Sequence, residues 1–311
     1  MSQKRVAIAC QGGGSQCAFV AGALKALFTR GLKERFDIVG LSGTSGGAIT
    51  AMLAWFGLLK QARGDPMPIE DRILGFWRDL TAQTPAEVLY DSLGVQLLQL
   101  MQSGSLPSIA SSPSSPPFRF WTNVADLLIG RPEFTDLRAL ITKHVDFDEA
   151  RSLVEPRSPV LLVGAADVLE GTFKTFSSMW GEIGVDSLLA SAAIPTLFPA
   201  VRVDGHAYWD GIFSSNPPVA GFLRKMLMGQ HPLPDEIWVI QVNRMPIDAV
   251  PESPSDIFDR RNHLAGNLSL QHEVQLIEIV NLLLAENALT DAFRARVGLD
   301  ASTAVTLRFI R

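Results

Sequence analysis

The chain has 311 residues, of which 47% are hydrophobic and 19% are charged. This composition supplies enough apolar surface for one large core and excludes an intrinsically disordered protein. A formal net charge of −5 argues against nucleic-acid binding and against a general attraction to anionic membranes. The longest apolar stretch, residues 48–59, is too short to cross a bilayer, and the first residues lack the pattern of a signal peptide. We therefore expect a cytoplasmic protein.

The first sixty residues alternate between strand-like and helical segments, and a glycine-rich turn follows each strand. Apolar strands are predicted at residues 5–11 and 36–41, and helical spacing follows at residues 18–30 and 48–59. Strand-turn-helix units in succession predict a parallel sheet with helices on its faces. The expected fold class is therefore α/β, a three-layer α/β/α arrangement around a central, mainly parallel sheet.

The middle of the chain, residues 61–157, is interpreted as a variable helical insertion or lid within one domain that spans residues 1–311. A run rich in serine and proline at residues 103–117 predicts an irregular surface loop. Helical pieces are predicted on both sides of this loop, at residues 69–80, 85–101 and 136–144.

The strand pattern resumes after the insertion. Two hairpins are predicted, one from residues 160–165 and 172–177 and one from residues 201–203 and 207–209. The remaining elements expected here are a helix at residues 187–193, a last core strand at 236–242 and a long helix at 276–296.

The sequence Gly43-Thr44-Ser45-Gly46-Gly47 is a G-x-S-x-G pattern between an apolar strand and an apolar helix. This is the context that a nucleophile elbow requires, because a serine in a strained strand-to-helix turn stands clear of the sheet. The small residues let the backbone turn, and the helix start stabilises developing negative charge. The pattern indicates Ser45 as a nucleophile, and a tight turn without a catalytic role is the alternative.

A second glycine cluster, Gly12, Gly13 and Gly14, ends the first strand and opens the first helix. Amide groups left unobstructed at a helix start suit an oxyanion hole or a phosphate cradle. A dinucleotide-binding loop would need a third glycine where this chain has Cys17, and Asp37 is poorly placed for a ribose contact. Dinucleotide binding is therefore disfavoured.

Ser45 needs a base, and the histidines of the chain are poorly placed for that role. None of them stands in a glycine-bounded turn after a strand, and Ser45 also comes earlier than the nucleophile of the usual α/β-hydrolase order. The histidines considered are His144, His206, His231, His263 and His272.

Asp210 is the better candidate for the base. It ends an apolar strand and is followed by Gly211, so its carboxylate can lie at the same edge of the sheet as Ser45. A carboxyl with an ordinary pKa of about 3.9 is a weak base, so burial must raise that pKa. The apolar surroundings are expected from the neighbours Tyr208, Trp209, Ile212 and Phe213. A plain hairpin turn is the alternative interpretation of the Asp-Gly pair.

In combination, these segments resemble the patatin-like phospholipase family. The glycine cluster at residues 12–14 looks like the oxyanion loop of the family, and residues 43–47 look like its G-T-S-x-G elbow. Residues 190–199 are similar to its A-S-x-A-x-P and F-P segment. Asp210-Gly211 with the later Asn216-Pro217-Pro218 looks like its D-G and N-P block.

The resemblance implies a lipid acyl hydrolase with a Ser/Asp dyad and a fold of the patatin and acyl-protein-transferase type. By carry-over, Ser45 is the nucleophile, Asp210 is the base, and amides in the loop Gly12, Gly13, Gly14 and Ser15 form the oxyanion hole. Gly43, Gly47 and Gly211 support the motifs. A phospholipid or lysophospholipid is the implied substrate, and neither a metal nor a cofactor is required.

The chain departs from the family pattern where Gln16 and Cys17 replace a basic residue followed by glycine, and where Ile212 replaces a third Gly or Ala. These departures bear on the rate more than on the assignment. Two alternatives stay open: a catalytically weak or inactive lipid-binding or protein-binding module with the same fold, and an acyltransferase.

Residues 222–228 mix basic and apolar side chains. A packed helix is the favoured interpretation, and contact with a membrane interface, which would make the protein peripherally membrane-associated, is the alternative. Cys10 and Cys17 are expected to be reduced and structural. The sequence indicates no oligomeric state.

Overall fold

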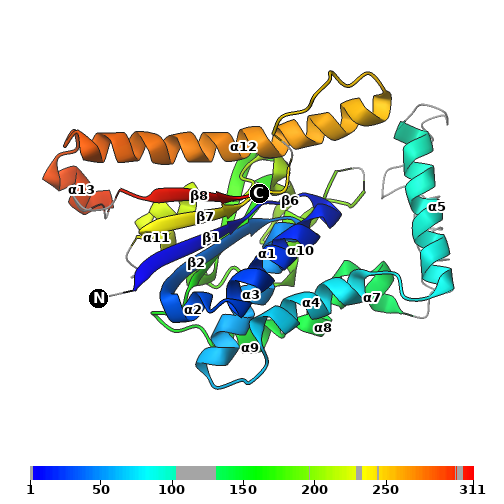
Figure 1. Cartoon of the computed structure of the whole chain (residues 1–311), viewed down its shortest axis with the longest axis horizontal. Coiled ribbons are helices and arrows are strands. Elements are labelled where there is room, and N and C mark those ends of the chain that lie inside the picture. The colour runs from blue at the N-terminus through cyan, green and yellow to red at the C-terminus, as the bar shows by residue number, and fades with distance from the viewer. Residues whose placement is uncertain are drawn as a thin grey trace.

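The computed structural model describes residues 3–102, 131–195, 197–228, 233–243, 245–297, 299 and 304–311. In these residues one eight-stranded sheet forms the centre of the molecule, and helices cover its faces (Figure 1). Its strands are β1 (Lys4–Cys10), β2 (Phe36–Thr44), β3 (Val160–Asp167), β4 (Thr172–Ser177), β5 (Val201–Val203), β6 (His206–Asp210), β7 (Glu236–Ile240) and β8 (Thr306–Ile310). The loop predicted at residues 103–117 lies outside the described residues.

The sheet is mainly parallel, as predicted. Hydrogen-bonded neighbours follow the order β5-β6-β3-β2-β1-β7-β8, and β4 also pairs with β3. The pairs β1-β2, β1-β7, β2-β3 and β7-β8 are parallel. The hairpins β3-β4 and β5-β6 and the pair β3-β6 are antiparallel.

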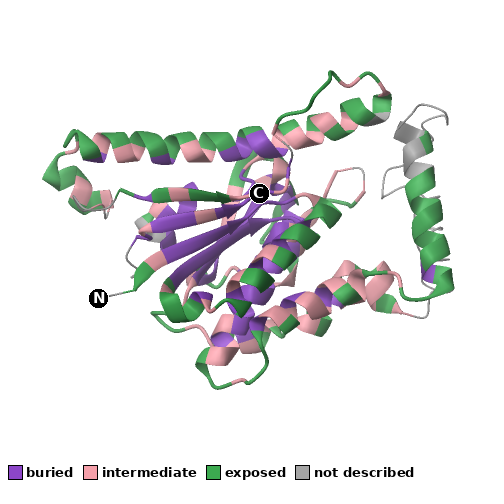
Figure 2. Ribbon diagram, viewed as in Figure 1, coloured by how far each residue is buried: buried purple, intermediate pink, exposed green. Residues whose placement is uncertain are grey.

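The apolar sequence of the central strands is explained by burial on both faces of the sheet (Figure 2). On β1, Val6 and Ile8 face one cluster of buried side chains, whereas Ala7 and Ala9 face another. A strand with two buried faces has no polar alternation, because neither side meets water. The three layers predicted from the sequence are therefore present.

The first cluster lies between the sheet and a layer of helices formed by α1 (Ala18–Thr29), α3 (Gly46–Ala62), α4 (Ile69–Leu80), α8 (Leu137–His144), α9 (Phe147–Ser152) and α10 (Val185–Ser191). The second lies beneath α12 (Pro254–Ala285), α11 (Lys225–Met228) and the 3-10 helix η4 (Ala220–Leu223). The other described helices are η1 (Gly14–Cys17), α2 (Leu32–Arg35), α5 (Pro85–Gln102), α7 (Pro132–Thr135), η2 (Ser178–Trp180), η3 (Gly211–Phe213) and α13 (Asp291–Val297).

The C-terminal part of the chain differs most from the prediction. The helix expected at residues 276–296 is wrong in its bounds, because α12 begins at Pro254 and a separate helix α13 follows it. The Ser253 side chain caps α12 by accepting a hydrogen bond from the Asp256 amide, and Pro254 stands in its first turn. Strand β8 was not predicted, since only parallel pairing with β7 makes this partly exposed segment a strand.

The described part of residues 61–157 contains helices that belong to the core and one helix, α5, that lies outside it. Ile73 and Phe76 of α4 and Leu140 of α8 are buried in the first cluster. By contrast, α5 exposes most of its described side chains and extends away from the sheet (Figure 1). A lid role for this region and the single-domain division remain predictions. None of the helices in the described ranges combines the length and apolar composition of a membrane span.

The segment 222–228 packs inward. Phe222, Leu227 and Met228 are buried in the second cluster and contact the sheet rather than solvent. The predicted packing is therefore confirmed, but the segment is not one helix, because η4 ends at Leu223 and α11 begins at Lys225. Phe222, Leu227 and Met228 are not available to a membrane interface.

Candidate active site

The ends of β2 and β6 meet on the same edge of β3. Residues Gly40 to Thr44 of β2 pair with Val160 to Gly164, and Asp210, the last residue of β6, pairs with Ala165. Since β4 occupies the opposite edge of β3 over this stretch, β2 and β6 must follow one another along the remaining edge. Ser45 comes directly after Thr44, so the register brings Ser45 and Asp210 together at the carboxyl ends of the parallel strands.

Ser45 stands at the sharp turn between β2 and α3. Its backbone has a φ of 56° and a ψ of −133°, a conformation that residues with a side chain rarely adopt. In the described residues Asp204 and Asn287 also have positive φ, but both are residue types that tolerate it. A strained residue of this kind persists only where its surroundings fix it, which is typical of functional sites.

Close backbone packing explains the glycines of the elbow. A β-carbon on Gly47 would overlap the carbonyl oxygens of Cys10 and Gln11, and one on Gly43 would lie 2.5 Å from the carbonyl oxygen of Gly47. Gly211 is restricted in the same way, because its β-carbon would lie 2.5 Å from the carbonyl oxygen of Gly164. The glycines that carried the motifs therefore allow β2, α3 and β6 to converge.

The Asp210 side chain is completely buried, and burial raises its pKa to about 7. Oδ1 accepts a hydrogen bond of 2.9 Å from the Ile212 amide. The Ser45 side chain is close enough to lower the pKa of Asp210, yet Oδ2 accepts no hydrogen bond of normal geometry from the described residues. The two side chains are therefore neighbours without a hydrogen bond between them. Catalytic hydrogen bonds often form or shorten only when substrate is bound.

The apolar surroundings of Asp210 are only partly those predicted. Tyr208 is buried, but Trp209 and Phe213 are exposed, so they do not enclose the carboxylate. Along β6, Trp209 points to the face opposite to that of Tyr208 and Asp210. Phe213 lies beyond the strand, in η3, and Ile212 is half-buried.

The glycine loop lies beside Ser45. A β-carbon on Gly12 would lie 2.5 Å from the Thr44 carbonyl oxygen and 2.9 Å from the Ser45 β-carbon. The first hydrogen bond of the η1 turn runs from the Gln16 amide to the Gly13 carbonyl oxygen, with a length of 3.2 Å. The amides of Gly13, Gly14 and Ser15 therefore precede the first hydrogen-bonded turn and lack an acceptor in η1.

Gly12 differs from the other residues of the predicted oxyanion hole. Its amide donates a hydrogen bond of 2.6 Å to Asn216 Oδ1, so this amide is already committed. Inclusion of the Gly12 amide as an oxyanion donor was therefore wrong, and the candidate donors narrow to Gly13, Gly14 and Ser15.

A buried polar network that the sequence analysis missed holds this loop. Asn216 Nδ2 and Asn243 Nδ2 both donate to the Gly12 carbonyl oxygen, at 3.3 and 3.1 Å. Gln11 Oε1 accepts from the amides of Val242 and Asn243. The only signal in the sequence was the N-P pair at Asn216; nothing local marks Gln11 or Asn243, which reach the site from β1 and from the end of β7.

The departures from the family pattern occupy different environments. Gln16 is exposed at the surface of the loop, whereas Cys17 is buried and its thiol donates to the Gln11 carbonyl oxygen at 3.4 Å. Cys10 and Cys17 are both free thiols, and burial raises the pKa of Cys17 to about 12. Neither is therefore a reactive thiolate, in agreement with a structural role.

Two of the histidines are engaged with other carboxylates. His144 Nε2 lies 2.9 Å from Asp79 Oδ2, and His206 Nδ1 lies 2.7 Å from Asp167 Oδ2. His231 lies outside the described residues. Neither described pair includes Ser45, which agrees with the preference for Asp210 as the base.

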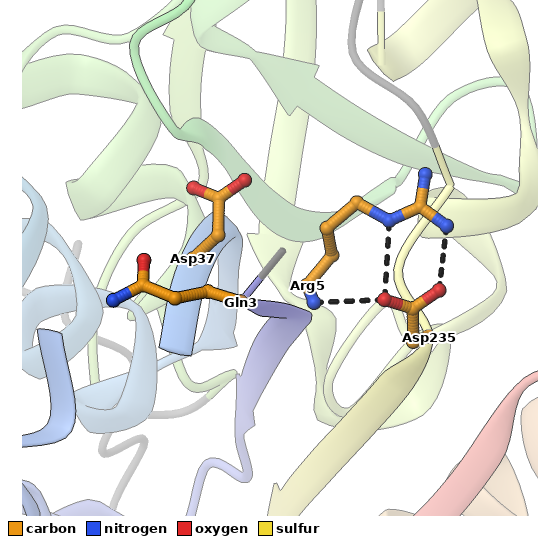
Figure 3. A pocket seen from close by; sticks show the side chains of 4 residues that line it. All are labelled: Gln3, Arg5, Asp37 and Asp235. Atoms are coloured by element: carbon orange, nitrogen blue, oxygen red, sulfur yellow. Dashed lines mark hydrogen bonds and ion pairs between the residues drawn. The ribbon is translucent and has the colours of Figure 1, made fainter. Parts of the chain in front are cut away.

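A hollow lined by Gln3, Arg5, Asp37 and Asp235 lies at the amino ends of β1 and β2 (Figure 3). Arg5 and Asp235 close one side of it with an ion pair of 2.5 Å between Nη2 and Oδ1. Ligands of open α/β sheets bind at the carboxyl ends of the strands, where Ser45 and Asp210 lie. The hollow is therefore separate from the candidate active site.

The fold and the site define an α/β protein with a serine elbow, a buried aspartate and a glycine loop at one end of a parallel sheet. The family model for "Patatin-like phospholipase" matches residues 8–223. The chain therefore belongs to the patatin-like phospholipase family. No curated protein matches the sequence.

Solved structures with similarity to the chain include VipD from Legionella pneumophila, with 15% identity and a TM-score of 0.39. The match covers 77% of this chain and 50% of that one. Another is the ExoU–SpcU complex from the type III secretion system of Pseudomonas aeruginosa, with 14% identity and a TM-score of 0.29, covering 95% of this chain and 57% of that one. The chain thus spans half to three fifths of the length of these proteins.

Proposed function

We propose that the chain is a serine lipid acyl hydrolase of the phospholipase A or lysophospholipase type, with Ser45 as the nucleophile and Asp210 as the base. The observation that carries this proposal is the meeting of a strained serine and a buried carboxylate at the junction of β2 and β6. Family membership supports the reaction class, and the acyl ester of a phospholipid or lysophospholipid is the proposed substrate.

In the first step Asp210 takes the proton of the Ser45 hydroxyl while Oγ attacks the acyl carbonyl carbon. The amides of Gly13, Gly14 and Ser15 donate to the oxyanion. The leaving alcohol, a lysophospholipid or a glycerophosphodiester, departs with the proton that Asp210 releases. In the second step Asp210 takes a proton from water, the resulting hydroxide attacks the acyl-enzyme, and the fatty acid leaves as Ser45 is reprotonated.

Burial of Asp210 suits this role. An ordinary aspartate has a pKa of about 3.9 and is too weak a base at neutral pH. A pKa of about 7 leaves the group largely ionised in slightly alkaline solution and gives its carboxylate a stronger affinity for the serine proton. Peripheral contact with a lipid surface is part of the proposal, since phospholipids are presented in aggregates.

The products formed from lipid test the reaction class. We expect purified protein incubated with mixed phospholipids and lysophospholipids to release free fatty acid together with the deacylated lipid, as measured by mass spectrometry. Added acceptor alcohol should not divert most of the acyl groups into new esters. Predominant ester formation would indicate an acyltransferase, and the absence of any acyl cleavage in folded protein would favour the non-catalytic alternative.

Substitution of Asn216 by alanine is expected to lower kcat/KM by ~10- to 100-fold, because small displacements of oxyanion donors have effects of this size. The change removes both hydrogen bonds to Gly12 and releases the loop that carries the amides. The rate of nitrophenyl-ester hydrolysis is the measurement.

Asn281→Ala is the matched control for Asn216→Ala. The Asn281 side chain makes the same reciprocal pair with a backbone, that of Val305, but it links α12 to the segment before β8. It should lower stability without a comparable loss of activity. Equal loss of activity in both variants would show that Asn216 acts only through general stability.

A further inference from the structure

We propose that Ser191, at the end of α10, is a positioning residue for the reaction at Ser45, and that the turn it begins sets the spacing between Ser45 and Asp210. This inference rests on the proposed function and assigns a role that neither the elbow nor the aspartate motif contains. The inference rests on two hydrogen bonds made by residues 191–193. One binds the backbone of Ser45 and the other binds the backbone of Asp210.

The first bond holds the nucleophile. The Ser45 amide donates to Ser191 Oγ at 2.9 Å, and Ser191 Oγ donates in turn to the Gly164 carbonyl oxygen at 2.6 Å. Ser191 is fully buried, so water does not compete for either bond. With its hydrogen directed at Gly164, the hydroxyl presents a lone pair to the Ser45 amide, and both of its roles are fixed.

The second bond holds the base. Two residues after Ser191, the Ala193 carbonyl oxygen accepts a hydrogen bond of 2.9 Å from the Asp210 amide. The segment from Ser191 to Ala193 therefore binds the backbone of the nucleophile and the backbone of the base. The strand β3 joins the same assembly, because Gly164 accepts from Ser191 and pairs with Thr44.

The need for such a clamp follows from the geometry of the elbow. The positive φ of Ser45 is unfavourable in isolation, and only the surrounding structure can maintain it. The Ser45 amide lies ahead of the first turn of α3, where helix geometry supplies no acceptor. Ser191 Oγ satisfies this amide in the strained conformation and thereby holds the Ser45 side chain toward Asp210.

Substitution of Ser191 by alanine should lower kcat by ~10- to 100-fold and leave KM within about twofold, since misplacement of a reacting group by about 1 Å has effects of this order. The labelling rate of Ser45 with a fluorophosphonate probe should fall in proportion. Ser191→Cys, which keeps the site filled with a somewhat larger atom that is a weaker acceptor, should show the same change and replaces Ser191→Ala if that variant does not fold.

Ser187→Ala is the matched control. Ser187 is a fully buried serine on the same helix, and within the described part of the chain its hydroxyl bonds only to the backbone of Gly184, just before α10. This variant should lose thermal stability but keep its kcat. A Ser191→Ala enzyme with the kcat and labelling rate of Ser187→Ala would overturn the positioning role.

The pH profile distinguishes a positioning role from a structural one. The Ser45 side chain lowers the pKa of Asp210, so displacement of Ser45 should shift the acid limb of kcat/KM to higher pH in Ser191→Ala and not in Ser187→Ala. An unshifted limb would contradict the inference. If Ser45→Ala itself kept full activity, the proposed function would fail; if only Ser191→Ala did, the inference alone would fail.

Discussion

Alanine at position 45 is expected to lower kcat for ester hydrolysis by ~10³- to 10⁶-fold, the range found when an activated serine is removed from a hydrolase. The substitution removes the hydroxyl that lies beside Asp210 at the β2–α3 turn, while Gly43 and Gly47 continue to shape the turn. The fold should persist, because alanine fits the small space and the positive φ is already maintained by neighbouring bonds. Hydrolysis of a medium-chain nitrophenyl ester measures the loss.

Ser42→Ala provides the matched control for this variant. Ser42 is also a buried serine of β2, and its hydroxyl has no hydrogen-bond partner within the described ranges. Its removal should leave both activity and stability near those of the wild type. Retention of activity in Ser45→Ala would refute the assignment of the nucleophile.

Replacement of Asp210 by asparagine should lower kcat/KM by ~10²- to 10⁴-fold, the usual contribution of a general base. Asparagine keeps the shape of the side chain and can still accept the Ile212 amide through Oδ1, but it cannot take the serine proton. In the wild type, activity should fall as the pH drops below about 7, because protonation of Asp210 removes the base. A wild-type rate in the variant would exclude Asp210 as the base.

The same substitution should change stability in a pH-dependent manner. The pKa of Asp210 is raised to about 7 in the folded chain, above the ordinary value of about 3.9, so the folded state binds this proton more tightly than the unfolded state does. The contribution of this group to the free energy of unfolding therefore decreases as the pH rises from about 4 to 7, and it is constant at higher pH. Asparagine does not ionise and avoids this loss.

The unfolding temperatures of wild type and Asp210→Asn, measured from pH 5 to 8.5, test this expectation. The unfolding temperature of Asp210→Asn should rise relative to that of the wild type as the pH increases. The difference between the two should become constant above about pH 7. A catalytic group that destabilises its own fold is a common trade-off between activity and stability. A difference that does not change with pH would show that Asp210 is not perturbed by burial.

Features with a local cause could be predicted from the sequence. The succession of strand, glycine turn and helix predicted β1, α1, β2 and α3, because these elements are set by apolar patterning and by glycines at their junctions. The Asp-Gly pair after an apolar segment predicted that Asp210 ends a strand, and Asp210 is the last residue of β6. Its meeting with Ser45 was predicted from the shared edge of the sheet, and the register of β3 with both strands explains it.

Features that depend on distant parts of the chain could not be predicted in this way. The Gly12 amide is bound by Asn216, which follows it by 204 residues, and no local pattern predicts such a pair. Ser191 belonged to a motif, but its bond to Ser45 exists only because the end of α10 packs against the junction of β2 and β3. Tertiary contacts of this kind decide which amides are free to bind an oxyanion.

The pairing of Ser45 as nucleophile with Asp210 as base is tested most directly by the rate at which a fluorophosphonate labels Ser45 between pH 5 and 9 in wild type and Asp210→Asn. This reaction forms a bond only at an activated serine and does not require knowledge of the lipid substrate. We predict that the wild-type rate rises through about pH 7 and reaches a plateau, while the variant is labelled ~10²-fold more slowly at the plateau and without that step. Labelling of both proteins at the same rate and with the same pH profile would contradict the role of Asp210 as the base. Labelling of a residue other than Ser45 would contradict the assignment of the nucleophile.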